Sequence, residues 1–336
     1  MFHPEQIIFA PTARCNLACA HCRVTRVPEE LSSTDAIAFL RDAADHGVGR
    51  LGFSGGEPFL RLDFLREVSA EAVGLGLLFD RLMTNGVWWK DEAELAEALD
   101  GLADAGFDGK IGLSVDAYHG QAADRLLAFI RTAHEAFGRR DCVEITSVIS
   151  ADDGPLLQTF RTLASGLGGM LLMDGKEPAA IAGEGRTGRR ERGKAATGAE
   201  PAADGEELRI DIIRFPYSAS AEEGWSAGGD WFKDDYCAGP GNVFYVHPNG
   251  KVAVCCGFAN ENEDLVAGRI PSDGFATIME RAASSSRVRM RYETGLGEAR
   301  KRLEAAGTTF PGRTEDICFF CDYLCKKSLP VALPFH

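Results

Sequence analysis

The sequence predicts an α/β protein: a partial (β/α)6 TIM-like barrel followed by a small C-terminal domain made of a β-hairpin and helices. Two observations predict it. Short apolar runs alternate with amphipathic stretches up to about residue 175, and the composition changes again from about residue 235. Six strands with helices between them are typical of a parallel sheet that carries its helices on the outside. A doubly wound sheet is the alternative, because periodicity alone does not separate the two folds.

The predicted strands are the apolar runs at residues 6–10, 51–53, 81–84, 111–115, 143–148 and 170–173. A first helix is expected to be capped by Ser33-Thr34-Asp35 and to run to His46, where Gly47 ends it. Further helices are predicted at residues 62–75, 90–105, 120–138 and 155–166. Residues 176–207 have little to bury, so we expect a mobile, solvated loop. The alternative is that the basic stretch at residues 186–192 contacts an acidic substrate or partner.

The last third of the chain contains a strong hairpin signal. Asn249-Gly250 lies between apolar runs at residues 243–246 and 251–254, and both residue types tolerate the positive φ of a tight turn. The hairpin places Cys255 at its far end, and a helix is predicted over residues 274–291. We therefore divide the chain into a core at 1–215 and a C-terminal domain at 235–330.

Charge and cysteine content narrow the class of protein. The net charge of −14 disfavours nucleic acid and anionic membrane surfaces as partners. No apolar run is long enough to cross a membrane and the start does not resemble a signal peptide, so a cytoplasmic protein is expected. Because the cytosol keeps thiols reduced, the nine of the ten cysteines that fall in two groups are predicted to bind metal or iron–sulfur clusters. Cys142 stands apart from the others and is predicted to be a buried core residue.

The first cysteine group, Cys15, Cys19 and Cys22, has the spacing C-x3-C-x2-C just after the first predicted strand. In a barrel this loop lies at the face where active sites are found. Three thiolates can bind three irons of a [4Fe–4S] cube and leave the fourth iron open to a small molecule. A zinc site needs a fourth ligand, and His21 is poorly placed to supply it because it is next to Cys22.

This spacing resembles the signature of the radical S-adenosylmethionine (SAM) superfamily. After the second strand, Gly55, Gly56, Glu57 and Pro58 are similar to the GGEP motif of that family. The resemblance implies that the three cysteines hold a catalytic [4Fe–4S] cluster that presents SAM. It also implies that the glycines let the backbone approach a ligand, and that Glu57 accepts hydrogen bonds from the SAM ammonium.

Weaker parts of the resemblance follow the third and fourth strands. Thr84-Asn85-Gly86 and Ser114-Val115-Asp116 look like motifs that line the SAM pocket, which implies that Asn85, Ser114 and Asp116 lie near the ribose or carboxylate. A plain turn or cap explains each of them equally well. His21 stands where the family usually has an aromatic residue. Tyr118 and His119, like Asp116, are candidates to face substrate, with surface or packing roles as the alternative.

The second group comprises Cys237, Cys255 and Cys256, followed much later by Cys318, Cys321 and Cys325. Its C-x12-G-x4-C opening and C-x2-C close resemble the SPASM and Twitch extensions of radical SAM enzymes. Six cysteines imply one auxiliary [4Fe–4S] cluster on Cys237, Cys255, Cys318 and Cys321, with Cys325 competing and Cys256 spare. A second, partly ligated cluster and a zinc knuckle are alternatives, as are ligand or capping roles for Asp230, Asp234 and Asp235.

The resemblance implies an enzyme that reductively cleaves SAM to a 5′-deoxyadenosyl radical, which abstracts a hydrogen atom from substrate. A one-electron donor such as flavodoxin or ferredoxin is then a partner. The first-ranked substrate is a ribosomally made peptide, modified by the chain as a maturase. The alternative is a small-molecule oxidoreductase or dehydrogenase of natural-product biosynthesis, which the short chain and single auxiliary cluster favour. A non-catalytic iron–sulfur or zinc module is the alternative from another class, and the GGEP motif argues against it.

Overall fold

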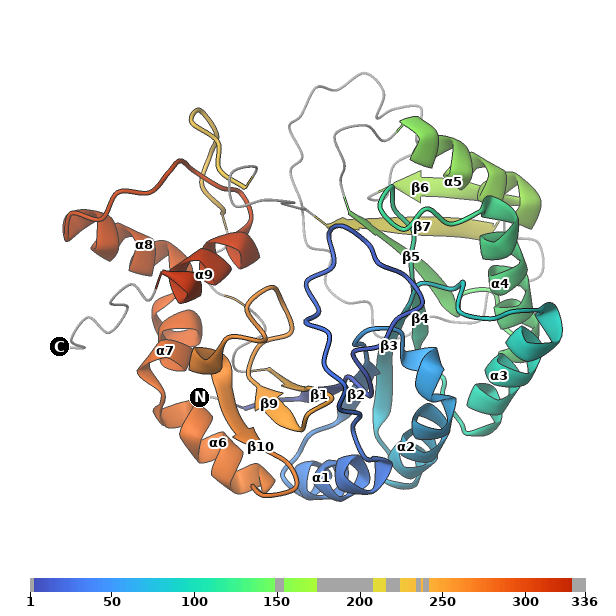
Figure 1. Ribbon diagram of the computed structural model, residues 1–336, viewed down its shortest axis with the longest axis horizontal. Coiled ribbons are helices and arrows are strands. Elements are labelled where there is room, and N and C mark those ends of the chain that lie inside the picture. Colours follow the sequence, from blue (N-terminus) through green and yellow to red (C-terminus); the bar gives the residue numbers. More distant parts are fainter. Residues whose placement is uncertain are drawn as a thin grey trace.

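The computed structural model of the protein describes residues 3–148, 154–173, 208–215, 224–233, 237 and 242–327. Its ten strands form one open sheet in the order β10-β9-β8-β1-β2-β3-β4-β5-β7-β6. The sheet curves, and α1 to α5 lie along its outer side (Figure 1). This is the partial barrel predicted from the alternating runs.

The core elements keep the order that the sequence predicts. They are β1 (Gln6–Phe9), α1 (Ser33–Asp45), β2 (Arg50–Phe53), a 3-10 turn η1 (Pro58–Arg61), α2 (Leu62–Gly74), β3 (Leu78–Thr84), α3 (Glu92–Asp104), β4 (Lys110–Ser114), α4 (Ala123–Ala136), β5 (Val143–Val148), α5 (Gly154–Leu167), β6 (Gly169–Met173) and β7 (Leu208–Phe215).

Two details of the core differ from expectation. The hydroxyl of Ser32, rather than a side chain of the following three residues, caps α1 by accepting a hydrogen bond from the Asp35 backbone N–H. Strand β7 was not predicted, and it lies between β5 and β6 and is parallel to both. All six strands predicted for the core are present, and β7 is an additional strand of the core.

The second half of the chain continues the same sheet. Its elements are β8 (Val243–Val246), β9 (Lys251–Ala253), a 3-10 turn η3 (Glu263–Leu265), β10 (Val266–Arg269), α6 (Phe275–Ser284), α7 (Ser286–Arg289), a π-helical turn η4 (Met290–Thr294), α8 (Leu296–Ala305) and α9 (Ile317–Lys326).

The predicted hairpin is confirmed, and it does not stand apart from the core. Strand β8 pairs in parallel with β1, with Gln6 opposite Val243, and β9 and β10 follow in antiparallel order. Gly250 has the positive φ of 80° that the turn requires. The predicted helix at 274–291 is present as α6, α7 and the start of η4.

Aromatic side chains fill the space between the sheet and its outer helices. Phe9, Phe53, Phe64, Phe107 and Phe129 are fully buried, and several of these rings meet edge to face or at a tilt. Burial of such large apolar surfaces is the dominant stabilising contribution to a fold of this kind. Cys142 is also fully buried, as expected for a core cysteine.

Candidate functional site

The loops that follow the parallel strands meet at one edge of the sheet, because the carboxyl ends of parallel strands lie at the same edge. The first cysteine group follows β1, the GGEP turn follows β2, the Thr84-Asn85-Gly86 turn ends β3, and Asp116 follows β4. The structure therefore brings together the motifs of the core that were singled out in the sequence.

The GGEP turn packs directly on the backbone of the cysteine loop. The N–H of Gly56 donates to the Thr12 carbonyl at 2.9 Å, and the N–H of Glu57 donates to the Arg14 carbonyl at 2.8 Å. A Cβ on Gly56 would lie 2.1 Å from the Arg14 carbonyl oxygen, and one on Gly55 would lie 2.8 Å from that of Thr12. The glycines thus permit close approach of the turn to the cysteine loop. Their approach to a ligand stays a prediction. Pro58 is buried and begins η1.

Glu57 is completely buried and ties two motifs together. Its carboxylate accepts hydrogen bonds from the Asn85 backbone N–H at 2.8 Å, the Thr84 hydroxyl at 2.9 Å and the Phe59 backbone N–H at 3.2 Å. Burial raises the pKa of Glu57 to about 7, although these donors oppose the rise. Through these hydrogen bonds Glu57 fixes the turn after β3. Its contact with the SAM ammonium stays a prediction.

The raised pKa of Glu57 predicts a pH dependence of stability. The folded state holds the proton more tightly than the unfolded state, where the pKa is near the ordinary 4.5. The stabilisation is therefore complete below about pH 4.5 and is lost as pH rises to about 7, by about 3 kcal/mol. Urea unfolding of the reduced, metal-free chain at pH 5 and pH 8 should show this loss, and Glu57→Gln should abolish that part of it. An equal pH dependence in both proteins would contradict the assignment.

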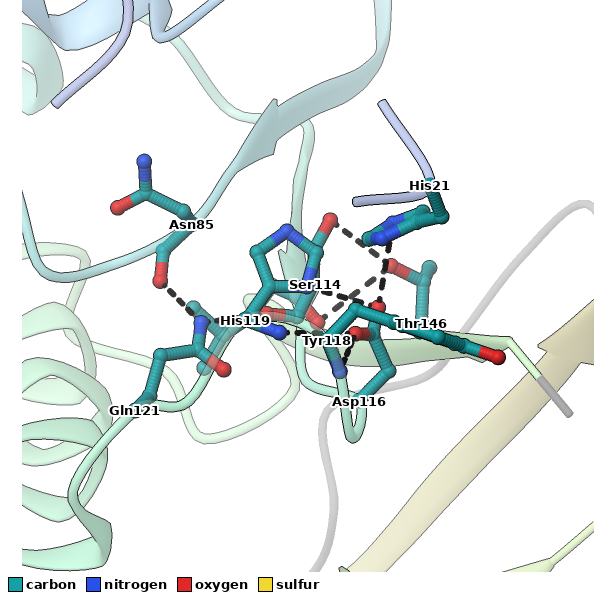
Figure 2. Close-up of polar contacts among 9 residues, drawn as sticks. His21, Asn85, Ser114, Asp116, Tyr118, His119, Gln121 and Thr146 are labelled. Carbon is teal, nitrogen blue, oxygen red and sulfur yellow. Dashed lines mark hydrogen bonds and ion pairs between the residues drawn. The ribbon is translucent and has the colours of Figure 1, made fainter. Parts of the chain in front are cut away.

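Asn85 connects the turn after β3 to the cysteine loop. Its side-chain Nδ2 donates to Asn16 Oδ1 at 2.8 Å and lies 3.6 Å from the Cys15 sulfur. Gln121 Nε2 donates to the carbonyls of both Asn85 and Ser114, at 2.6 and 2.7 Å (Figure 2). Asn85 thus lies beside a predicted cluster ligand. The Ser114 hydroxyl lies 3.5 Å from the hydroxyl of Thr146 on β5.

Asp116 lies between two histidines from different loops. Its carboxylate is 2.8 Å from His119 Nδ1 and 3.7 Å from His21 Nε2, and it also accepts from the backbone N–H groups of Tyr118 and His119 (Figure 2). Burial raises the pKa of Asp116, but the close contact and charge of His119 and the charge of His21 outweigh it, so that this pKa lies below its usual value. Burial lowers the pKa of His21.

The ring of His21 packs against two neighbouring rings, one at a tilt and one edge to face. Its centroid is 4.9 Å from that of Tyr118 and 5.0 Å from that of His119. His21 is next to Cys22, so the loop after β4 is held against the third cysteine of the first group. The ligand atoms of His21, Asp116 and His119 lie within 4.8 Å of one another, a spacing that a metal ion can also bridge. The contact of 2.8 Å between Asp116 and His119 Nδ1 is close enough for an ion pair, although it does not have the geometry of a hydrogen bond.

The three thiols of the first cysteine group share one environment. Cys15 and Cys19 are half-buried and Cys22 is exposed. Burial, together with the charges of Cys15, Asp116 and Cys22, raises the pKa of Cys19 to about 11. The Cys15 sulfur also accepts from the Leu17 backbone N–H at 3.4 Å. Mutually repelling thiolates with N–H donors nearby are a donor set that an iron–sulfur cluster satisfies, because bound iron removes the repulsion.

The second cysteine group converges although its members lie far apart in sequence. Cys318, Cys321 and Cys325 recur at i, i+3 and i+7 on α9, and therefore share one face of the helix. The sulfurs of Cys318 and Cys255 both lie beside Gly257, at 3.1 and 3.9 Å from the position of a Cβ on that residue. Burial, together with the charges of Cys321, Cys256 and Cys237, raises the pKa of Cys255. The donor set therefore suits a buried cluster with four thiolate ligands. Cys256 is exposed.

A set of aromatic rings holds α9 in place. The ring of Trp225 lies 6.2 Å from that of Phe310, measured between centroids. The ring of Trp231 lies 5.7 Å from those of Phe310 and Phe320. The side chain of Asp316 caps the helix by accepting from the backbone N–H groups of Cys318 and Phe319. The position of the three thiols is thus fixed by packing and capping.

The two cysteine groups are connected by the segment that follows Cys22. Arg23 pairs with Asp322, next to Cys321, at 3.3 Å, and its guanidinium lies 4.3 Å from the centre of the Phe258 ring. The backbone N–H of Thr25 donates to Glu261 at 2.8 Å. One loop thus contacts both the first cysteine group and the surroundings of the second.

Several residues of the site were not identified from sequence. Arg26 donates to the carbonyls of Ala13 and Leu17, and so links the backbone on the two sides of Cys15. Gln121 follows the Asp116 motif closely enough that its position could have been suspected. Arg291, which contacts Cys321 and Cys325, had no signal in the sequence because it lies 30 residues before the nearer of them.

Some sequence predictions lie outside the described residues. These are the loop at 176–207 with its basic stretch, Asp234 and Asp235. Asp230 is described and is exposed. No helix among the described ranges is long and apolar enough to span a bilayer.

Comparisons with known proteins find similarity over part of the chain. The model of the radical SAM superfamily matches residues 9–148. The PqqA peptide cyclase of Rhizobium meliloti is 39% identical over 128 residues, which are 37% of this chain and 32% of the cyclase. The match thus spans about a third of the length of that relative.

Two solved structures share the fold over most of the chain. BtrN in complex with AdoMet and 2-DOIA has a TM-score of 0.50 at 15% identity, covering 94% of this chain and 96% of BtrN. SuiB of Streptococcus suis bound to its precursor peptide SuiA has a TM-score of 0.52 at 14% identity, covering 95% of this chain and 76% of SuiB. At these identities the likeness establishes the fold alone.

Proposed function

We propose, from the match of residues 9–148 to the radical SAM family model, that the chain is a radical SAM enzyme that modifies a peptide. The observation that carries the proposal is the cysteine loop after β1, held by the GGEP turn, by Asn85 and by the loop of Asp116. Cys15, Cys19 and Cys22 would hold the [4Fe–4S] cluster and leave one iron for SAM. When bound, this cluster supplies one electron, which splits SAM into methionine and a radical that abstracts hydrogen from substrate.

The side chains around the loop have positioning roles in this proposal. Asn85 orients the Cys15 sulfur by hydrogen bonding, and Glu57 keeps the backbone of Asn85 in place. Asp116 fixes the His119 ring. His119 and Tyr118 would line the site on the side of His21 and Cys22. Side chains in this position would exclude water and hold the substrate close to the 5′-carbon of the deoxyadenosyl radical. A flavodoxin or ferredoxin would supply the electron.

A peptide is the substrate class that the comparisons favour. The relative with 39% identity is named for a peptide, and SuiB was solved with a precursor peptide. A small-molecule substrate is the second candidate, supported by the match to BtrN over nearly the whole of both chains. The second cysteine group would hold one auxiliary [4Fe–4S] cluster in either case.

Deuterium transfer distinguishes the two substrate classes. Extracts of the source cells, grown in deuterated medium, are separated into a peptide fraction and a fraction of smaller molecules. Each is given to the anaerobically reconstituted enzyme with SAM and dithionite, and deuterium in 5′-deoxyadenosine is measured by mass spectrometry. We expect transfer from the peptide fraction that protease treatment abolishes. Transfer only from the smaller, protease-resistant fraction would favour the small-molecule enzyme instead.

A further inference from the structure

Arg291 is a buried cation among the cysteines of the second group. It lies in the π-helical turn η4, is 2% exposed, and has three hydrogen-bond acceptors. Its Nε donates to the Cys321 sulfur at 3.0 Å, its Nη2 donates to the Cys325 sulfur at 2.9 Å, and its Nη1 donates to the Arg287 carbonyl. Within the described ranges, no carboxylate forms an ion pair with this guanidinium.

A buried guanidinium without an anionic partner is unfavourable, because removing a charge from water carries a large desolvation penalty. Carboxylates are the usual partners, yet the nearest acidic residue in sequence, Glu293, pairs with Arg289. Asp322, which is next to Cys321, pairs with Arg23 and Lys326. The negative charge next to Arg291 must therefore reside on sulfur. Thiolates that ligate iron, together with the cluster they hold, meet this need continuously.

Hydrogen bonds to cluster sulfurs and nearby positive charge both stabilise the more negative, reduced form of an iron–sulfur cluster, and so raise its reduction potential. The guanidinium of Arg291 provides both at once, with two directed N–H···S contacts. We propose that Arg291 is a positioning residue that sets the potential of the auxiliary cluster, an inference that rests on the proposed function. A higher potential favours acceptance of one electron by the cluster from the substrate radical. The radical becomes a closed-shell product when it gives this electron to the cluster and one proton to solvent.

The experiment uses the full chain with Cys15, Cys19 and Cys22 changed to Ala, so that only the second cysteine group can hold iron. After anaerobic reconstitution, the midpoint potential is measured by redox titration followed by electron paramagnetic resonance. Arg291→Gln and Arg291→Lys are compared with the parent. Arg287→Gln is the matched control, because this arginine lies one turn earlier and pairs with Asp264 rather than with sulfur.

We expect the potential of Arg291→Gln to be more negative than that of the parent, with Arg291→Lys between them and Arg287→Gln unchanged. Equal potentials in Arg291→Gln and Arg287→Gln would overturn the proposal. Loss of the cluster from both Arg291 variants would also overturn it, since the residue would then only build the site. Because the parent for this test lacks the first cysteine group, the outcome does not depend on SAM cleavage, which is assayed separately with the unaltered chain.

Discussion

Changing Cys15, Cys19 and Cys22 together to Ala is expected to abolish SAM cleavage and to remove about four of about eight irons per reconstituted chain. The three thiols lie in one loop, and the charges of Cys15 and Cys22 raise the pKa of Cys19. The three cysteines are therefore expected to act as one ligand set. The measurement is iron content together with 5′-deoxyadenosine formed in the presence of dithionite.

Cys142→Ala is the matched control for this variant. Cys142 is fully buried in the core, away from both groups, so its loss should leave the iron content and the 5′-deoxyadenosine yield unchanged. Retention of all the iron by the triple variant, or SAM cleavage at the rate of the unaltered chain, would contradict the assignment of the first cluster.

The second large effect is expected from a single methyl group at Gly56. The Cβ of Gly56→Ala would lie 2.1 Å from the Arg14 carbonyl oxygen and 2.7 Å from the backbone of Ala13, so the cysteine loop must move. Overpacking of this kind costs about 1–3 kcal/mol of stability. Because Cys15 follows directly after Arg14, we also expect at least about a tenfold loss of SAM cleavage, as small misplacements of reacting groups have effects of this order.

Gly49 is a close control, because it lies just before β2 and Gly56 lies just after it. No atom lies within 4 Å of a Cβ built on Gly49, so Gly49→Ala should preserve both stability and activity. Urea unfolding and 5′-deoxyadenosine formation are measured for both variants. If Gly56→Ala matched Gly49→Ala in both measurements, the close packing of the GGEP turn on the cysteine loop would have no functional role.

Local signals in the sequence were sufficient for much of the fold. Asn249-Gly250 identified the hairpin, and the apolar runs located six strands, because turns and strands depend on residues that are close in sequence. Strand β7 was missed: it follows a long segment without apolar periodicity, and its pairing with β5 and β6 involves residues more than thirty positions away. The parallel pairing of β8 with β1 is likewise a long-range contact that no local pattern reports.

The candidate site shows the same division. Spacing alone brought forward the two cysteine groups, since metal ligands need particular residue types at particular intervals. It did not distinguish a residue that meets a ligand from one that supports the site. Glu57 was identified by its motif, but its hydrogen bonds with Thr84 and Asn85 are long-range contacts that the motif does not report, and its contact with the SAM ammonium stays a prediction. Arg291 was not anticipated, because a buried arginine is recognised only by what surrounds it.

The most direct test of the account is SAM cleavage by the unaltered chain. The anaerobically reconstituted protein is reduced with dithionite in the presence of SAM, and 5′-deoxyadenosine and methionine are quantified by mass spectrometry. The account predicts that both accumulate in equal amounts and only when the protein has been loaded with iron and sulfide. A chain that binds zinc in its cysteine groups and forms no 5′-deoxyadenosine would contradict it, and would identify the protein as a non-catalytic metal-binding module.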